Sequence, residues 1–237
     1  ICFERPCKIS QNFSQKINSE LSQYLLLIES STQICSIGLL ENDRVIHLLE
    51  SEAPNVHTER MTVMIQQVLA AAGIKAWDLD AVAVSDGPGS YTSLRVGLSV
   101  AKGLCYTLQK PLITIPSLDI LAYGVQSSVI RNDGVIIPMI DARRNEVYAA
   151  RYDALRHRLT PPLSIILDKN WFDDLPEDDS KVILCGNGAE KAGQFFRDRG
   201  YVLAFSETSA RFMCNPALIK FRQQDFSDVA FHTPYYH

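Results

Sequence analysis

The sequence has no long apolar run: the longest, such as residues 24–28 and 135–140, have only the length of a β-strand. No segment therefore has the length of a membrane-spanning helix. The chain also carries little net charge, −4 over 237 residues, which argues against nucleic-acid binding by this chain alone through its overall field. We expect a soluble protein without membrane contact, for which any basic surface is supplied by a partner.

Paired cysteines and a signal peptide are missing as well. The six cysteines form no CxxC pair, and three of them lie inside apolar runs, where a thiol behaves as a small hydrophobic group. This usage is typical of the reducing cytoplasm. The first 22 residues are rich in Ser, Gln and Asn and lack an apolar core, so residues 1–23 are expected to be a poorly ordered leader.

Regular patterns begin at Tyr24. Three β-rich runs separated by short polar turns predict an antiparallel meander over residues 24–52. A helix, a strand, a second helix and a strand are expected to follow at 57–72, 81–85, 91–109 and 111–116. Asn55 is the expected N-cap of the first helix, and Gly73 is expected to end it. This order predicts an α/β lobe of ribonuclease H type over residues 24–116.

The remaining residues, 117–237, are expected to form a smaller C-terminal lobe. Strand patterns recur at 134–141, 146–153, 161–167 and 181–186. Helix patterns cover 187–199 and 209–224, and Pro216 is expected to break the second of them.

The segment SDGPGSYTSLRVGLSVAKGL, residues 85–104, lacks the residues that a nucleotide-binding loop needs. A P-loop requires a lysine directly after its last glycine, and a dinucleotide fingerprint requires a third glycine where Thr92 stands. Two alternatives remain for Gly87 and Gly89. They form a tight turn capped by Ser90 or Thr92, or they contact a phosphate weakly at the helix N-terminus.

The helix after this turn is apolar over much of its circumference. Leu94, Leu98, Ala101 and Cys105 form one stripe, and Gly97 lies in a ridge of small residues. Such a helix is buried from more than one side, either within its lobe or by a partner.

Several longer motifs carry a resemblance to a known family. They are LLLIESSTQICSIGL, HTERM, the segment 85–104 with PLITIPSLDILA, IDARRNEVYAA, LCGNGAEK and FHTPYYH. On these motifs the sequence resembles the bacterial TsaB (YeaZ) family, the non-catalytic partner of the tRNA threonylcarbamoyladenosine enzyme TsaD, over residues 24–236. The resemblance implies two ribonuclease H-like lobes of the actin, Hsp70 and sugar-kinase (ASKHA) superfamily.

The resemblance also indicates how the chain differs from an enzyme. In TsaD a metal is held partly by two histidines of an HxxxH helix, whereas the aligned segment here begins with His57 and ends with Met61. A thioether is a poor ligand for hard or borderline divalent metals. We therefore expect no catalytic residue, no metal and no cofactor of its own, with ATP, ADP or Mg²⁺ bound at most in an assembled complex.

Ser30, Ser31 and Thr32 lie in the turn where kinases of this class bind phosphate. Together with Gly87 and Gly89 they are the candidate contacts for weak nucleotide or phosphate binding. Turn chemistry explains these hydroxyls equally well.

The resemblance implies a scaffold subunit of the complex that forms N6-threonylcarbamoyladenosine beside the anticodon of tRNA. Its expected partners are a TsaD-like subunit in a heterodimer and a TsaE-like ATPase, with a homodimer when isolated and tRNA contacted mainly through the complex. The expected interface is a helical bundle. Nine residues are predicted to contribute to it: Met61, Met64, Ile65, Val68, Leu94, Gly97, Leu98, Ala101 and Cys105.

Two other functions stay open: a glycoprotease-like (M22-like) metallohydrolase, which requires a metal, and an ATP-dependent small-molecule kinase of the ASKHA class. An arginine cluster also has two interpretations. It either contacts tRNA phosphates or belongs to a local ion-pair network built by Asp141, Arg143 and Glu146. The cluster comprises Arg143, Arg144, Arg151, Arg156 and Arg158.

Overall fold

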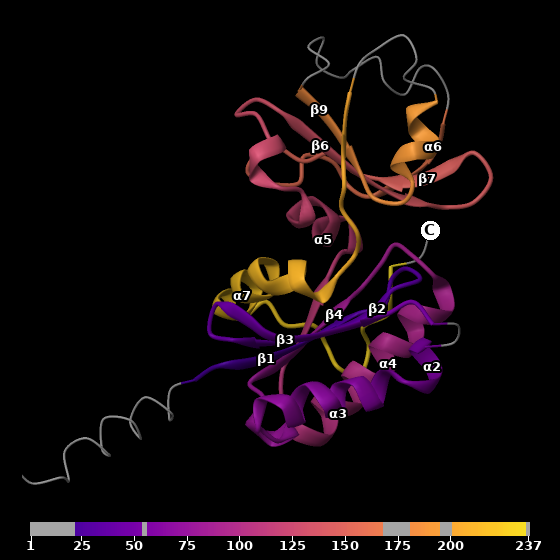
Figure 1. The fold of residues 1–237 in the computed structure, drawn as a ribbon. Helices are drawn as coiled ribbons and strands as arrows, with labels where there is room; N and C mark the ends of the chain where they lie inside the picture. Colours follow the sequence, from indigo (N-terminus) through magenta and orange to yellow (C-terminus); the bar gives the residue numbers. More distant parts are fainter. Residues whose placement is uncertain (1–21, 54–55, 168–180, 195–200, 236–237) are drawn as a thin grey trace, which may run out of the picture.

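The computed structural model describes residues 22–53, 56–167, 181–194 and 201–235. The chain forms two lobes, each built on a five-stranded sheet (Figure 1). Most of the predicted leader and the predicted N-cap Asn55 lie outside the described residues. Within the described ranges, no helix is long and apolar enough to cross a membrane.

The first sheet has the strand order β3-β2-β1-β4-β5. Its strands are β1 (Tyr24–Glu29), β2 (Cys35–Glu41), β3 (Arg44–Ser51), β4 (Ala81–Ser85) and β5 (Leu112–Ile115). The first three form the predicted antiparallel meander, and β4 and β5 extend the sheet parallel to β1. The predicted ribonuclease H type of this lobe is confirmed.

Helices cover both faces of the first sheet (Figure 1). They are α3 (Met61–Ala72) and α4 (Tyr91–Leu108) on one face, and the 3₁₀ turn η4 (Ala210–Met213) with α7 (Cys214–Gln223) on the other. In β1, Leu26 and Ile28 pack toward α3 and α4, whereas Leu25 and Leu27 pack toward η4 and α7. Because β1 is covered on both faces, its sequence is a continuous apolar run and does not alternate.

The second sheet repeats the strand order of the first, as β8-β7-β6-β9-β10. Its strands are β6 (Val135–Asp141), β7 (Glu146–Ala149), β8 (Leu163–Ile166), β9 (Val182–Cys185) and β10 (Val202–Ala204). Again the first three are antiparallel, and the last two extend the sheet parallel to the first. The helices α5 (Ser117–Gly124) and α6 (Ala189–Gly193) pack on opposite faces. The two lobes are therefore similarly built, although their sequences show no repeat.

The first predicted helix, 57–72, is divided in the structure. A short helix α2 (Val56–Glu59) precedes α3, and Arg60 between them has φ −122° and ψ −13°. The apolar spacing that predicted the helix starts at Met61, which is where α3 begins. Gly73 ends α3 at φ +69°, as predicted.

The second half of the chain contains further differences. Helix α5 and strand β10 were not predicted, the latter because it has only three residues. Pro216 lies in the first turn of α7, where a missing N–H is tolerated, so the predicted break falls at η4 instead. The predicted helix 187–199 is described only as α6, since residues 195–200 lie outside the described ranges.

The predicted smaller lobe, 117–237, includes a segment that packs on the first sheet. Ala210, Met213 and Leu218 of η4 and α7 lie in one cluster with Leu25 and Ile113. The chain thus returns to the first lobe after β10, because the second face of the first sheet is apolar and needs a cover.

Candidate functional site

The nine residues predicted at an interface face inward. Met61, Met64, Ile65 and Val68 of α3 pack beneath the first sheet and are at most 6% exposed. The α4 residues are buried in the same lobe: Leu94, Gly97, Leu98, Ala101 and Cys105. This corrects the prediction. Each apolar stripe covers its own sheet, so these side chains have no surface left to offer a partner.

The opposite face of α3 and α4 is exposed, and on α4 it combines short residues with the exposed Arg95 and Tyr106. It includes Val63 and Gln67 of α3 and Thr92, Ser99 and Gly103 of α4. A Cβ built on Gly103 would meet nothing within 4 Å, so no contact within the chain requires glycine there. A mid-helix glycine costs about 1 kcal/mol relative to alanine. Short residues on an exposed helix face allow another helix to approach closely.

The glycines of the strand-to-helix turn serve contacts within the chain. Gly87 has φ +104°, and a Cβ there would lie 2.6 Å from the carbonyl oxygen of Tyr235 in the C-terminal segment. A Cβ on Gly89 would collide with the carbonyl oxygen of Ser31. The N–H of Ser90 donates to that same oxygen at 2.7 Å, and its side chain makes no capping hydrogen bond. These contacts support the tight turn, but the predicted cap is wrong, because Ser90 makes no capping bond and Thr92 lies inside α4.

Of the hydroxyls proposed to contact phosphate, those of Ser31 and Thr32 bond within the chain, whereas that of Ser30 is buried without a hydrogen-bond partner among the described residues. Ser30 and Ser31 are at most 1% exposed, but Ser31, Thr32 and Gly89 line one hollow of about 770 Å³ together with His57 and Arg143, so weak phosphate contact there stays a prediction. The Ser31 hydroxyl donates to Oε1 of Glu29 at 2.5 Å, and the hydroxyl of Thr32 lies 2.7 Å from that of Thr208. The Ser31 hydroxyl already donates to Glu29, and Glu29 offers a phosphate no positive charge.

Glu29 is a fully buried carboxyl group at the end of β1. Its Oε1 accepts hydrogen bonds from the N–H and the hydroxyl of Ser31, while its Oε2 has no hydrogen-bond partner among the described residues. Burial raises the pKa of Glu29, and the hydrogen bonds from Ser31 oppose this rise. The folded chain therefore holds a proton on this group more tightly than the unfolded chain does.

We expect a Glu29→Gln variant to be more stable than the parent protein at pH 8, by about 1 kcal/mol. The folded-state pKa is raised, so the stability that Glu29 contributes is complete below its ordinary pKa of 4.5 and is lost as the pH rises through the folded-state pKa. Glutamine removes this loss. Urea unfolding at pH 5 and pH 8 measures the difference in free energy of unfolding between the variant and the parent, which should be larger at pH 8. A difference that does not change with pH, or that also appears for the exposed Glu59→Gln control, contradicts the expectation.

His57 and Met61 do not lie on one helix face. The ring Nε2 of His57, in α2, is 3.3 Å from the carbonyl oxygen of Ile34, and burial lowers the pKa of His57. Met61 begins α3 and is 1% exposed in the core. The i, i+4 geometry of an HxxxH pair is thus not formed at these positions.

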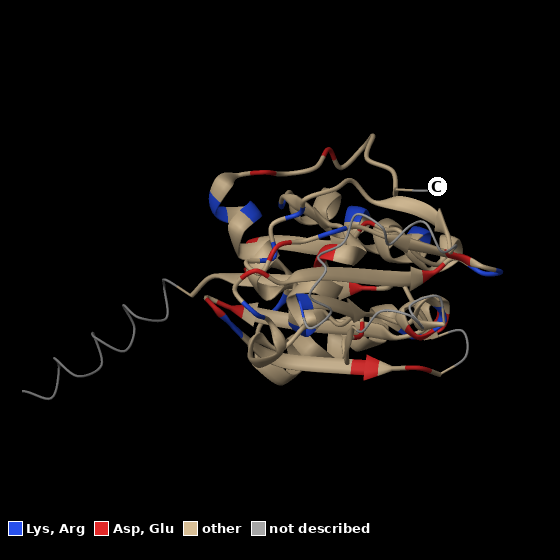
Figure 2. Cartoon of the chain, turned by 90° about the horizontal axis from the view of Figure 1, so that it is seen from above, with Lys and Arg blue, Asp and Glu red and all other residues tan. Residues whose placement is uncertain are grey.

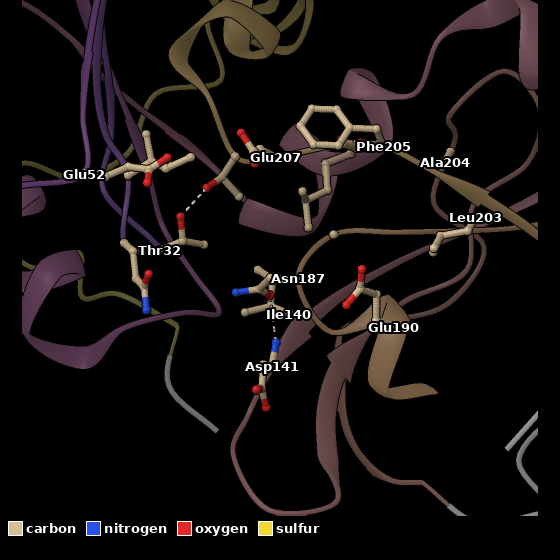
Figure 3. A pocket seen from close by; sticks show the side chains of 16 residues that line it. Thr32, Glu52, Ile140, Asp141, Asn187, Glu190, Leu203, Ala204, Phe205 and Glu207 are labelled. Carbon is tan, nitrogen blue, oxygen red and sulfur yellow. Dashed lines mark hydrogen bonds between the residues drawn. The ribbon is translucent and has the colours of Figure 1, made fainter. Parts of the chain in front are cut away.

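A cleft of about 620 Å³ lies between the two lobes (Figure 3). Residues 32–34 and Glu52 line it from the first lobe, and residues 203–208 with the ends of β6 and β9 line it from the second. The carboxylates of Glu52, Glu190 and Glu207 border it without a hydrogen bond or ion pair among the described residues. Its volume lies in the range of about 300–1,000 Å³ that is typical of ligand sites.

Two of the five clustered arginines, Arg156 and Arg158, have structural roles. Arg156, at φ +68°, donates to the carbonyl oxygens of Ala122 and Val125 at the end of α5. Arg158 pairs with Asp119 at 3.2 Å. Figure 2 shows that Lys and Arg are dispersed among acidic residues over the chain. Arg156 and Arg158 are therefore engaged within the chain.

At the β6–β7 hairpin the cation that pairs with Asp141 is Lys191 and not the predicted Arg143. Lys191 pairs with Asp141 at 2.8 Å and also donates to the carbonyl oxygens of Arg143 and Glu146. The exposed side chains of Arg143 and Arg144 have no hydrogen bond or ion pair within the described part of the chain. This corrects the prediction that Arg143 itself supplies the pairing charge.

The two sheets with one strand order, and the cleft between them, define a two-lobed α/β protein of the ribonuclease H-like (ASKHA) class. The family model described as TsaD, tRNA N6-adenosine threonylcarbamoyltransferase, matches residues 51–170. The chain belongs to the TsaB (YeaZ) family of tRNA threonylcarbamoyladenosine biosynthesis proteins, which is related to TsaD.

Named relatives agree with this membership. The tRNA threonylcarbamoyladenosine biosynthesis protein TsaB of Bacillus subtilis (strain 168) is 29% identical over 210 residues, which are 86% of this chain and 90% of the relative. TsaB of Escherichia coli (strain K12) is 35% identical over 130 residues, and this match spans 54% of each protein, about half their length.

Two solved structures from Pseudomonas aeruginosa share the fold. YeaZ has a TM-score of 0.75 at 22% identity and matches 91% of this chain and 100% of its own. An uncharacterized protein with similarity to peptidase YeaZ has a TM-score of 0.78 at 22% identity, with 90% and 99% covered. At this identity the likeness establishes the fold of both lobes.

The sequence did not predict that residues 203–208 of the second lobe line the cleft. Leu203 and Phe205 are exposed there, and they alternate with the less exposed Val202 and Ala204. In the sequence these four residues are all apolar, so no alternation of apolar and polar residues marked β10.

Proposed function

We propose that the chain is the non-catalytic scaffold subunit of a complex that forms N6-threonylcarbamoyladenosine beside the anticodon of tRNA. Membership of the TsaB family supports this proposal. In it, the chain pairs with a TsaD-like transferase, a TsaE-like ATPase is a further member, and tRNA is contacted mainly through the complex in the cytoplasm. ATP, ADP and Mg²⁺ belong to the assembled complex, and this chain needs no cofactor of its own.

The observation that carries the proposal is the exposed face of α3 and α4, defined by Val63, Gln67, Thr92, Ser99 and Gly103. Gly103 lies in open space, which favours a partner helix that packs closely at this position. Both helices pack against the face of the first sheet that lies away from the second lobe (Figure 1). A standard interface buries about 1,600 Å² in total, and without the transferase the same face can pair two copies of this chain.

We expect Gly103→Arg to weaken binding of the TsaD-like subunit at least about tenfold, because a long charged side chain prevents close helix packing. The same change should not lower the stability of the isolated chain, since arginine favours a helix more than glycine does. Titration calorimetry with the purified subunit measures the first effect, and urea unfolding measures the second.

Gln223→Arg, at an exposed position of α7 on the opposite side of the sheet, is the matched control. It should bind the subunit as the parent does. Equal affinity of the Gly103→Arg variant and the control would remove this face from the interface.

Two features of the site count against the alternative functions. A metallohydrolase of the HxxxH type needs two ligands on one helix face, whereas His57 and Met61 lie on separate helices. A kinase that binds phosphate through the 30–32 turn needs accessible hydroxyls, whereas Ser30 and Ser31 are buried. Stoichiometric zinc or iron bound in part by His57, or micromolar ATP binding by the isolated chain, would overturn the scaffold proposal.

A further inference from the structure

The cleft between the lobes contains an exposed apolar strip at β10. Leu203 is 50% exposed and Phe205, directly after β10, is 82% exposed, and both line the cleft. In Figure 3 the Phe205 ring and the Leu203 side chain lie along one side of the space. Large apolar side chains exposed within a concave site indicate a surface that another molecule covers.

The charged residues that line this cleft are of one sign, whereas the adjoining hollow, which shares Glu52 and Asp141 with it, is also lined by His57 and Arg143. Glu52, Glu190 and Glu207 carry the unpaired carboxylates of the cleft, while that of Asp141 is paired with Lys191. No lysine, arginine or histidine is among the described residues that line it. Unpaired carboxylates without a neighbouring base repel phosphates and attract cations.

The three carboxylates do not converge on one point. Within the described residues no group of three or more His, Cys, Asp or Glu side chains is placed to hold a metal ion. In Figure 3, Glu52 and Glu190 lie on opposite sides of the space, with Glu207 above it. The arrangement therefore fits several separate cationic groups and not a single ion.

We propose that this cleft docks an extended basic segment of a partner protein. Charge complementarity identifies the occupant: its lysine or arginine head groups pair with Glu52, Glu190 and Glu207, and its side-chain carbons lie on Leu203 and Phe205. β10 is the last strand of the described sheet, and a sheet edge offers main-chain groups to an extended peptide. This surface is separate from the exposed face of α3 and α4, so the inference does not depend on the proposed function.

The test uses a fluorescein-labelled octapeptide of alternating Lys and Leu, with an alternating Glu and Leu peptide for comparison, and the full chain. Fluorescence anisotropy should show binding of the basic peptide that weakens between 50 and 300 mM NaCl. Glu190→Gln/Glu207→Gln and Phe205→Ala should each weaken it at least about fivefold. All three positions are exposed, so circular dichroism should show folded variants.

Matched controls remove the same groups outside the cleft. Asp43→Asn/Glu59→Gln also removes two exposed carboxylates that are unpaired among the described residues, and Phe231→Ala removes a ring that is 85% exposed. Both controls should bind the basic peptide as the parent does. The inference is overturned if the parent does not bind it, if the controls lose as much affinity as the cleft variants, or if equimolar spermidine displaces the peptide, which would assign the cleft to small polyamines.

Discussion

Ala101→Arg is expected to unfold the first lobe. Ala101 is 0% exposed and lies in the cluster that α3, α4 and the first sheet share. A guanidinium group at this position is a buried charge without a partner, and such a charge costs about 3–5 kcal/mol. This is a large part of the 5–15 kcal/mol that typically stabilises a domain, so urea unfolding should show a lost or strongly lowered transition.

Ser99→Arg supplies the control for this expectation, because Ser99 is an exposed residue of the same helix. Its free energy of unfolding should stay within about 0.5 kcal/mol of the parent value. An Ala101→Arg variant that unfolds at the parent's urea midpoint would show that α4 is not packed as described. Loss of partner binding by Ala101→Arg therefore reports on folding, and binding tests belong on the exposed face.

Gly97 and Gly103 of α4 are expected to respond in opposite directions to the same substitution. A Cβ on Gly97 would collide with the hydroxyl of Ser30, which is itself 0% exposed. Gly97→Ala should therefore lower the free energy of unfolding by about 2 kcal/mol, the cost of overpacking a core. Gly103→Ala should raise it by up to about 1 kcal/mol, because nothing lies within 4 Å and alanine favours the helix.

The two variants serve as controls for each other, since they change the same atoms in one helix. Urea unfolding at a fixed pH gives both values. A stabilised Gly97→Ala variant would mean that Ser30, at the end of β1, shifts at little cost to make room for the added methyl group. A destabilised Gly103→Ala variant would mean that the exposed face is already covered in the isolated protein, for example by a second copy of the chain.

Much of the first lobe could be predicted from local patterns. The meander, the 81–85 strand, the helix from Tyr91 and the end of α3 at Gly73 all follow from periodicity and turn chemistry. The elements of the second lobe were harder to predict from the sequence because they are short: β10 has three residues and α6 has five. Short elements carry too few residues to show a period.

The candidate site divides in a similar way. The motifs of the segment 85–104 identified the family, but they could not say which face of α4 is outward. An apolar helix face suits its own sheet and a partner equally well, and only packing shows that Leu94, Leu98 and Ala101 cover the sheet. Likewise, the turn sequence allowed a phosphate contact by Ser31, and only the position of Glu29 assigned its hydroxyl to a buried carboxylate.

By itself, then, the sequence determined the order of elements, the ribonuclease H-like type of the first lobe and the family, because these depend on periodicity and on motifs of adjacent residues. Only the tertiary structure decided which helix face is exposed and that the Arg156 side chain donates to a carbonyl oxygen at the end of α5. It also decided that the carboxylates of Glu52, Glu190 and Glu207 border one cleft. These features join residues far apart in the chain. Their placement depends on how the two sheets and their covering helices pack, which no local pattern records.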